Sequence, residues 1–194
     1  FSFLLGYYFI ESLAGRIKLP PAAAALQLAL ALSLLINVRQ TNLVLCVIIV
    51  FAITVLALRD QEINFGAYFR YLVLAVIPAI MVYLAWRYHI VANLGKLSNA
   101  ELTLRPFDSW YIKDIPAIIS QMGVVAFKKI GFFAPMLIAC AFAIRGLIRF
   151  ETKFDRISVL VAILFLGYTS FLLMMYVGYF GRSSALAVIS FWRY

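Results

Sequence analysis

Repeated apolar runs constrain this chain more than any other feature of its sequence. Hydrophobic residues make up 65% of the 194 residues and charged residues only 13%, against about half and a quarter in ordinary globular domains. A bilayer requires apolar runs of roughly 15 to 24 residues from a spanning helix. We therefore expect an all-α, polytopic transmembrane helical bundle of about six membrane segments, at residues 1–13, 20–36, 43–58, 71–86, 130–144 and 157–180. Only the last run is long enough without help, so the others are expected to tilt, bend or end inside the protein.

The domain organisation follows from the same pattern. Residues 1–194 are expected to form a single transmembrane domain, with no repeat or linker that suggests a second one. Because the sequence opens with Phe1 and stops at Tyr194 just after an apolar stretch, we expect it to be a fragment of a longer polytopic protein. Cys46 and Cys140 lie inside apolar runs and are predicted to act as small buried hydrophobes.

The basic residues in the short connections predict the orientation, because cytoplasmic loops are enriched in Lys and Arg. One side receives most of them: Arg16, Lys18, Arg59, Arg70, Arg145, Arg149, Lys153 and Arg156. This side is predicted to be cytoplasmic. The short connections that hold Arg39, Arg182 and Arg193, and the long loop 87–129, are predicted to face the periplasm or a lumen. The net charge of +9 is thus assigned to helix anchoring and contact with anionic lipid, not to nucleic acid.

Two charged or aromatic stretches carry further expectations. In the long loop, Ile118, Ile119, Met122 and Val125 recur at helical spacing, which predicts one amphipathic helix lying on the outer membrane surface. Four aromatic residues, Trp86, Tyr88, Trp110 and Tyr111, are expected at headgroup depth. The densest charged run, residues 145–156, is expected to be a solvated, lipid-facing connection.

A cluster of hydrogen-bonding side chains between two apolar runs is the best sequence clue to function. It reads Arg39, Gln40, Thr41 and Asn42. Arg offers a charged, planar fork of donors that suits phosphate oxygens, and Gln and Asn both donate and accept hydrogen bonds. The cluster therefore suits a sugar phosphate. A polar turn that only caps two helices in the headgroup zone is the alternative on composition alone.

The order of these segments resembles a known family of membrane enzymes. The aromatic-rich segment 6–12, a short basic turn, an apolar segment and then Arg39 to Asn42 resemble the polyprenyl-phosphate-sugar-dependent membrane glycosyltransferases of the GT-C superfamily. The run Arg39 to Asn42 is similar to the Arg-Gln-Thr-Asn motif of the dolichyl-phosphate-glucose alpha-1,2-glucosyltransferases. The closing stretch, 179–182 through 190–194, resembles the Arg-Tyr-bearing outer segments of bacterial GT-C-like proteins.

The resemblance implies an enzyme that moves a sugar from a polyprenyl phosphate to a glycan or lipid acceptor on the non-cytoplasmic face, for cell-envelope glycan assembly. Arg39 and Arg193 would stabilise the departing phosphate, Gln40 and Asn42 would orient sugar or phosphate oxygens, and Tyr194 would stack or hydrogen-bond nearby. The catalytic acidic residue of the family would lie upstream of Phe1. The location implied is a bacterial inner membrane with Arg39 and loop 87–129 on the periplasmic side.

Other classes stay open. The sequence holds no GxGxxG, Walker, HExxH or GxSxG motif, and we expect no metal and no cofactor. A transporter or flippase of lipid-linked glycans is one alternative, for which the patch 167–170 is the main polar feature inside a run; that patch equally suits close helix packing. An O-antigen-type polymerase or ligase is the other. The single histidine, His89, and the loop residues Asp108 and Asp114 are expected to be structural.

Overall fold

The computed structural model describes residues 2–38, 42–94, 105–180 and 182–188. Over these residues the chain is all-helical, with no strand. The long helices are α1 (Ser2–Leu13), α2 (Pro21–Val38), α3 (Asn42–Arg59), α4 (Phe65–Leu94), α5 (Ile115–Lys128), α6 (Ile130–Arg149) and α7 (Lys153–Gly178). Three short elements complete the set: η2 (Phe107–Ser109), η3 (Ile112–Asp114) and α8 (Arg182–Ala187).

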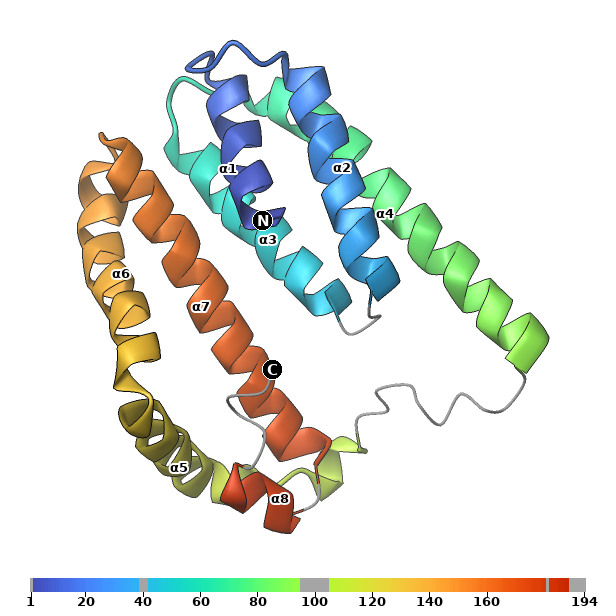
Figure 1. The fold of residues 1–194 in the computed structure, drawn as a ribbon, viewed down its shortest axis with the longest axis vertical. Coiled ribbons are helices and arrows are strands. Elements are labelled where there is room, and N and C mark those ends of the chain that lie inside the picture. Colours follow the sequence, from blue (N-terminus) through green and yellow to red (C-terminus); the bar gives the residue numbers. More distant parts are fainter. Residues whose placement is uncertain (1, 39–41, 95–104, 181, 189–194) are drawn as a thin grey trace.

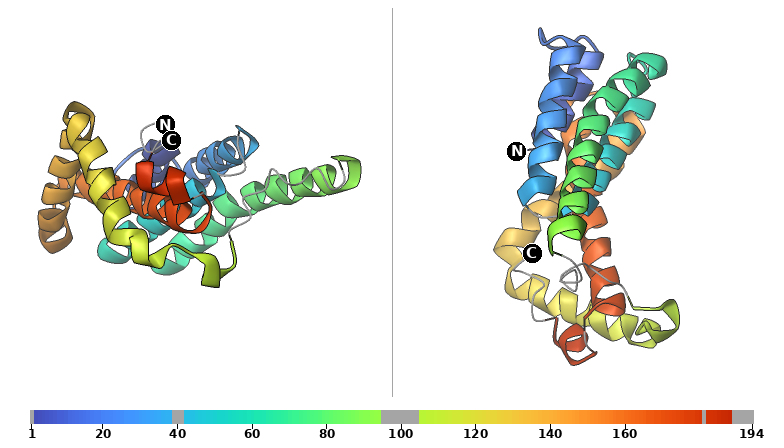
Figure 2. Two further views of the ribbon diagram at one scale, coloured as in Figure 1. Left: turned by 90° about the horizontal axis from the view of Figure 1, so that it is seen from below. Right: turned by 90° about the vertical axis from the view of Figure 1, so that its right-hand side faces the viewer.

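The helices form two groups that meet along α7. In the first group α2 packs against α4 and α1, and α1 also contacts α3. In the second group α6 and α7 pack side by side, while α5 and α8 lie across the end of α7 (Figures 1 and 2). Contacts from α3 and α1 to α7 join the groups. The larger buried cluster lies around Phe9, Leu28 and Ile53 and continues into α6 and α7, and a second cluster lies around Ile118, Tyr176 and Val177 in the second group.

Within the described residues, four helices are long and apolar enough to cross a membrane: α2, α3, α4 up to Asn93, and α7. The bent pair 112–128 and 133–149 would add a fifth, with an angle of 111° between its arms. The all-helical membrane class is thus confirmed, whereas the expected number of about six segments is not. The two expected segments that are not among the four are 1–13 and 130–144: α1 covers 12 residues, and the arm 133–149 is counted only together with the arm that precedes it.

Helix α4 is longer than the apolar run 71–86 predicted, and the expectation that only the last run reaches full length is wrong. Asn64 explains the early start, because its Oδ1 accepts hydrogen bonds from the backbone N–H groups of Gly66 (2.9 Å) and Ala67 (3.3 Å), as an N-cap side chain does. At the other end the helix continues to Leu94, well past the apolar run. The resulting 30 residues extend for about 45 Å, so α4 is longer than a hydrocarbon core is thick.

Glycines allow the closest approaches between the helices. A Cβ built on Gly167 of α7 would lie 2.8 Å from Cγ2 of Ile48 in α3, and one on Gly146 of α6 would lie 2.8 Å from the backbone oxygen of Asp155 in α7. The Gly167 contact supports the packing interpretation of the 167–170 patch, because a small residue lets two helices approach closely.

Candidate functional site

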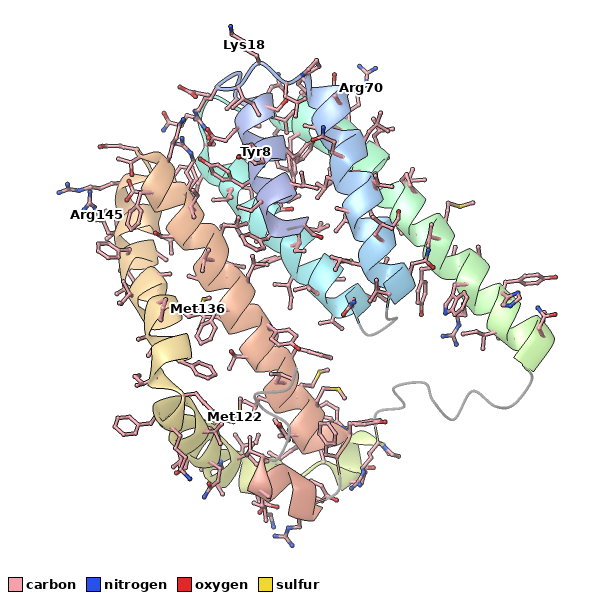
Figure 3. The ribbon with its side chains drawn as sticks, viewed as in Figure 1. Tyr8, Lys18, Arg70, Met122, Met136 and Arg145 are labelled. Atoms are coloured by element: carbon pink, nitrogen blue, oxygen red, sulfur yellow. The ribbon has the colours of Figure 1, made fainter. Side chains whose placement is uncertain are left out.

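The charged residues gather at two opposite ends of the bundle. Helices α1 and α3 end, and α2, α4 and α7 begin, at one end, which also carries Lys18, Arg70 and Arg145 (Figure 3). We call this the basic end. The other end holds the close of α2, the start of α3, and α5 with Met122 (Figures 1 and 3). We call it the far end. This division agrees with the two sides that the Lys and Arg positions predicted.

Most of the predicted donor-binding residues fall outside the described residues: Arg39, Gln40, Arg193 and Tyr194. The exception is Asn42, the first residue of α3. Its Nδ2 donates a hydrogen bond of 2.9 Å to the backbone oxygen of Leu35 in α2. The Asn42 amide therefore ties the end of α2 to the start of α3, which fixes the ends of the connection that holds Arg39.

The segment after residue 104 is docked onto the C-terminal end of α7. The backbone N–H of Arg105 donates to Gly178 O (2.9 Å), and that of Tyr111 donates to Val177 O (3.1 Å). The indole of Trp110 lies on Gly178, where an added Cβ would meet Cε2 at 2.8 Å, and its Nε1 donates to Arg105 O (2.8 Å). The Arg105 guanidinium donates to the Tyr111 hydroxyl. Trp110 and Tyr111, expected at headgroup depth, thus also fasten the loop to α7.

The two described acidic residues of this loop, Asp108 and Asp114, have positions that suit structural roles. Asp114 precedes α5, and its two oxygens accept hydrogen bonds from Arg182 Nε (2.8 Å) and Nη2 (3.2 Å). This ion pair joins the loop to α8 and raises the pKa of the Arg182 guanidinium above its ordinary value. Asp108 lies in the first turn of η2. His89 stacks on Trp86 with ring centroids 5.9 Å apart, which agrees with its expected structural role.

Among the residues that the structure describes, the most deeply buried charges lie at the basic end, where the sequence predicted no site. Glu11 of α1 is 1% exposed and Arg156 of α7 is 4% exposed. Arg156 Nε donates to Glu11 Oε1 at 2.8 Å, and Arg156 Nη2 lies 3.5 Å from Glu11 Oε2. This pair joins residues 145 positions apart and connects the two helix groups. The expectation that run 145–156 is a solvated connection is therefore wrong for Arg156 and for Asp155, which is 1% exposed.

A second guanidinium extends the pair into a cluster. Arg16, in the turn after α1, donates to both oxygens of Asp60 (2.7 and 2.8 Å). It also lies 3.4 Å from Glu11 Oε1 and pairs with Glu62. We call Glu11, Arg16, Asp60, Glu62 and Arg156 the ion-pair cluster. The cluster contains two basic and three acidic groups. Because the acidic Glu62 lies at its exposed edge, the positive and negative charges of the other four groups nearly balance.

The cluster changes the protonation equilibria of its members outside the helices. Burial favours the neutral acid of Asp60, but the hydrogen bonds from Arg16 and from the Glu62 backbone N–H outweigh it. The pKa of the Asp60 carboxyl is therefore held below its ordinary value. The hydrogen bonds between Arg16 and the Asp60 carboxylate in turn raise the pKa of the Arg16 guanidinium above its usual range. Both groups stay charged at neutral pH.

The turn from α6 to α7 positions Arg156. Phe150 ends α6 in the left-handed conformation (φ 48°), and Thr152 then begins α7 with a capping box. Thr152 Oγ1 accepts from the Asp155 N–H (3.1 Å), and Asp155 Oδ2 accepts from the Thr152 N–H (3.0 Å). The reciprocal bonds satisfy two backbone donors at the helix start, and the next residue, Arg156, donates to Glu11 of α1. A sequence signal existed, since Thr152 and Asp155 have capping-box spacing.

The ion-pair cluster is chemically suited to holding helices together. Each buried carboxylate already accepts hydrogen bonds from a guanidinium, so little unsatisfied capacity is left for a ligand. The part of the chain that the structure describes contains no group of three or more His, Cys, Asp or Glu side chains that could hold a metal. An ionisable residue at the end of an apolar run, such as Glu11, was the signal for this cluster, because such residues are rare in membrane helices and usually have a partner.

Comparison with protein-family models, with curated proteins and with solved structures found no match for this chain. The resemblance to the GT-C superfamily therefore stays a prediction from the short motifs. The fold and the two charged ends are what the structure itself provides, and we conclude that the chain is an all-helical protein with helices long and apolar enough to span a membrane.

Proposed function

We propose that this chain belongs to a membrane glycosyltransferase of GT-C type. It would transfer a sugar from a polyprenyl-phosphate donor to a glycan or lipid acceptor on the non-cytoplasmic face of the membrane. In a bacterium that face would be the periplasmic side of the inner membrane, and the product would be a cell-envelope glycan.

The observation that carries the proposal is the position of the connection between α2 and α3. Val38 ends α2 and Asn42 begins α3 at the far end of the bundle, away from the ion-pair cluster. The C-terminal end of α7 and the docked loop 105–114 also lie at the far end. This arrangement supports a site to which the connection and the segment after α7 both contribute, as the resemblance implies for Arg39 and Arg193.

The chemistry needed there is charge stabilisation. When the bond between sugar and phosphate breaks, negative charge develops on the phosphate, and a fixed guanidinium lowers the energy of that state. Arg39 and Arg193 are proposed for this role, with Gln40 and Asn42 orienting oxygens and Tyr194 beside them. Asn42 already uses its Nδ2 on Leu35, so its Oδ1 is the atom proposed to accept from a sugar hydroxyl.

The test is a transfer assay on the full-length protein in membranes supplied with a radiolabelled polyprenyl-phosphate hexose. Arg39→Ala is expected to abolish the transfer of label to an acceptor, with protein level and insertion unchanged. Arg39→Lys keeps the charge but loses the planar fork of donors, so it should retain only part of the activity. Arg70→Ala, an exposed arginine at the basic end, is the matched control and should leave turnover unchanged. Full activity of Arg39→Ala would remove Arg39 from the site.

The same assay separates the alternatives. A transporter or flippase would move the labelled lipid between leaflets without attaching the sugar to an acceptor. Such a protein is expected to place ionisable groups near the bilayer midplane. In the four candidate spans the buried ionisable groups, Asp155 and Arg156, lie within the first turn of α7, so the structure offers no observation that favours transport over transfer.

A further inference from the structure

Helix α5 presents three different sectors. Ile118 and Met122 are buried against the second hydrophobic cluster. A second sector exposes large apolar side chains, with Ile119 at 51%, Val124 at 43% and Phe127 at 77% exposure. At 100° per residue, Gln121 and Lys128 fall together on a third, polar sector. The helix is therefore apolar toward the protein and also over part of its outer surface.

Basic groups flank this exposed apolar sector. Lys113 lies in η3 just before α5, Lys128 is its last residue, and both side chains are exposed. The acidic residue nearest to the start of the helix, Asp114, is already bound by Arg182. The free charge along the outer surface of α5 is therefore positive.

The geometry sets α5 across the direction of the spans. The arm that contains α5 makes an angle of 111° with the arm 133–149, and α6 packs alongside the membrane-length α7. A helix nearly perpendicular to α6 therefore lies roughly across the direction of α7, along a membrane surface that the candidate span α7 would reach. Figure 2 shows α5 crossing the far end of the bundle in this way. Fourteen residues make it about 21 Å long.

From these observations we propose that α5 is a docking surface for the anionic lipids of the bilayer. Phe127, Ile119 and Val124 would enter the acyl region below the headgroups, as the apolar residues of interfacial helices do. Lys113 and Lys128 would bind the phosphates of anionic headgroups, whose charge is complementary. The inference does not depend on the proposed enzyme activity, because it concerns only the lipid that surrounds the far end.

The test uses full-length protein in nanodiscs of phosphatidylcholine with one fifth phosphatidylglycerol, in a Cys46→Ala, Cys140→Ala background. A bimane on Phe127→Cys reports quenching by either lipid in its brominated form. We expect brominated phosphatidylglycerol to quench more than brominated phosphatidylcholine at equal mole fraction. One lysine near a charged surface favours anionic lipid by roughly fivefold, so Lys113→Gln with Lys128→Gln should bring the quenching ratio close to one.

Two controls keep the experiment decisive. Lys18→Gln with Lys153→Gln removes the same charge from exposed lysines at the basic end and should leave the ratio unchanged. A bimane on Ile77→Cys, exposed in the middle of α4, should be quenched in every sample and so verifies insertion. If Ile77→Cys is quenched but Phe127→Cys is not, α5 is covered by protein or water and the proposal is wrong. Equal quenching of Phe127→Cys by the two lipids would refute the anionic preference.

Discussion

Removing one partner of the Glu11–Arg156 pair should destabilise the protein strongly and unequally. Both side chains are almost fully buried, at 2% and 5% exposure, so solvent screens their interaction little. Breaking such a pair leaves a buried charge without compensation, which costs about 3–5 kcal/mol. Arg156→Met leaves Glu11 with Arg16 at 3.4 Å, so its cost should lie near the lower limit. Glu11→Leu leaves Arg156 with a 3.4 Å bond to the Glu151 backbone oxygen, and its cost should lie near the upper limit.

The double variant tests the physical reason. Because Glu11→Leu with Arg156→Met removes both charges, it should be more stable than the sum of the single changes by about 2 kcal/mol, within the usual range for residues in contact. The assay is reversible unfolding of the full chain in mixed micelles, followed by circular dichroism. Lys153→Met, exposed in the first turn of α7, is the matched control and should stay within about 0.5 kcal/mol of the parent. Single variants that cost no more than this control, or strict additivity, would refute the reasoning.

Two further predictions concern packing and pH. Gly146→Ala should destabilise the chain by about 1–3 kcal/mol, because the new Cβ would lie 2.8 Å from the Asp155 backbone oxygen; Gly123→Ala, with nothing within 4 Å, should be neutral or slightly stabilising in the same unfolding assay, and equal effects would contradict the close approach of α6 and α7. The Asp60 pKa is lowered in the folded protein, so its stabilisation is present above the unfolded value of about 4 and is lost as pH falls through the folded value. In the Asp60→Asn variant the free energy of unfolding should therefore fall less steeply with pH below about 4. A variant that keeps the parent's slope would show that the ion pair between Arg16 and Asp60 does not cause the acid-dependent loss of stability.

The helical class could be predicted from the sequence because hydrophobicity alone decides it. Apolar runs with charged turns have few other solutions in a bilayer. The boundaries were less predictable, since they depend on local chemistry beyond the apolar run. The early start of α4, for example, depends on the side chain of Asn64.

The burial of Arg156 could not be read from its own neighbourhood in the sequence. It lies in a charged run beside exposed residues such as Lys153, and its partner is 145 positions away. Only the packing of α1 against α7 brings the two charges together. Composition could suggest that Glu11 needs a partner, but topology decides which guanidinium provides it.

The predicted donor site lies mostly outside the described residues. Of its residues the structure describes Asn42, whose amide joins α3 to α2, a contact that agrees with the capping alternative for the polar turn. This use leaves the Asn42 carbonyl oxygen for the proposed role. The sequence motif thus predicts a chemistry, whereas the structure gives the positions of the two helices, α2 and α3, on either side of the motif.

The most direct test of the account is the side of the membrane on which each end of the bundle lies. Single cysteines at Val38, the last residue of α2, and at Lys18, in the turn before it, can be labelled with a membrane-impermeant maleimide in sealed, right-side-out vesicles that lack Cys46 and Cys140. We predict rapid labelling of Val38→Cys from outside and labelling of Lys18→Cys only after permeabilisation. Labelling of both positions from one side, or of Lys18→Cys alone from outside, would contradict it.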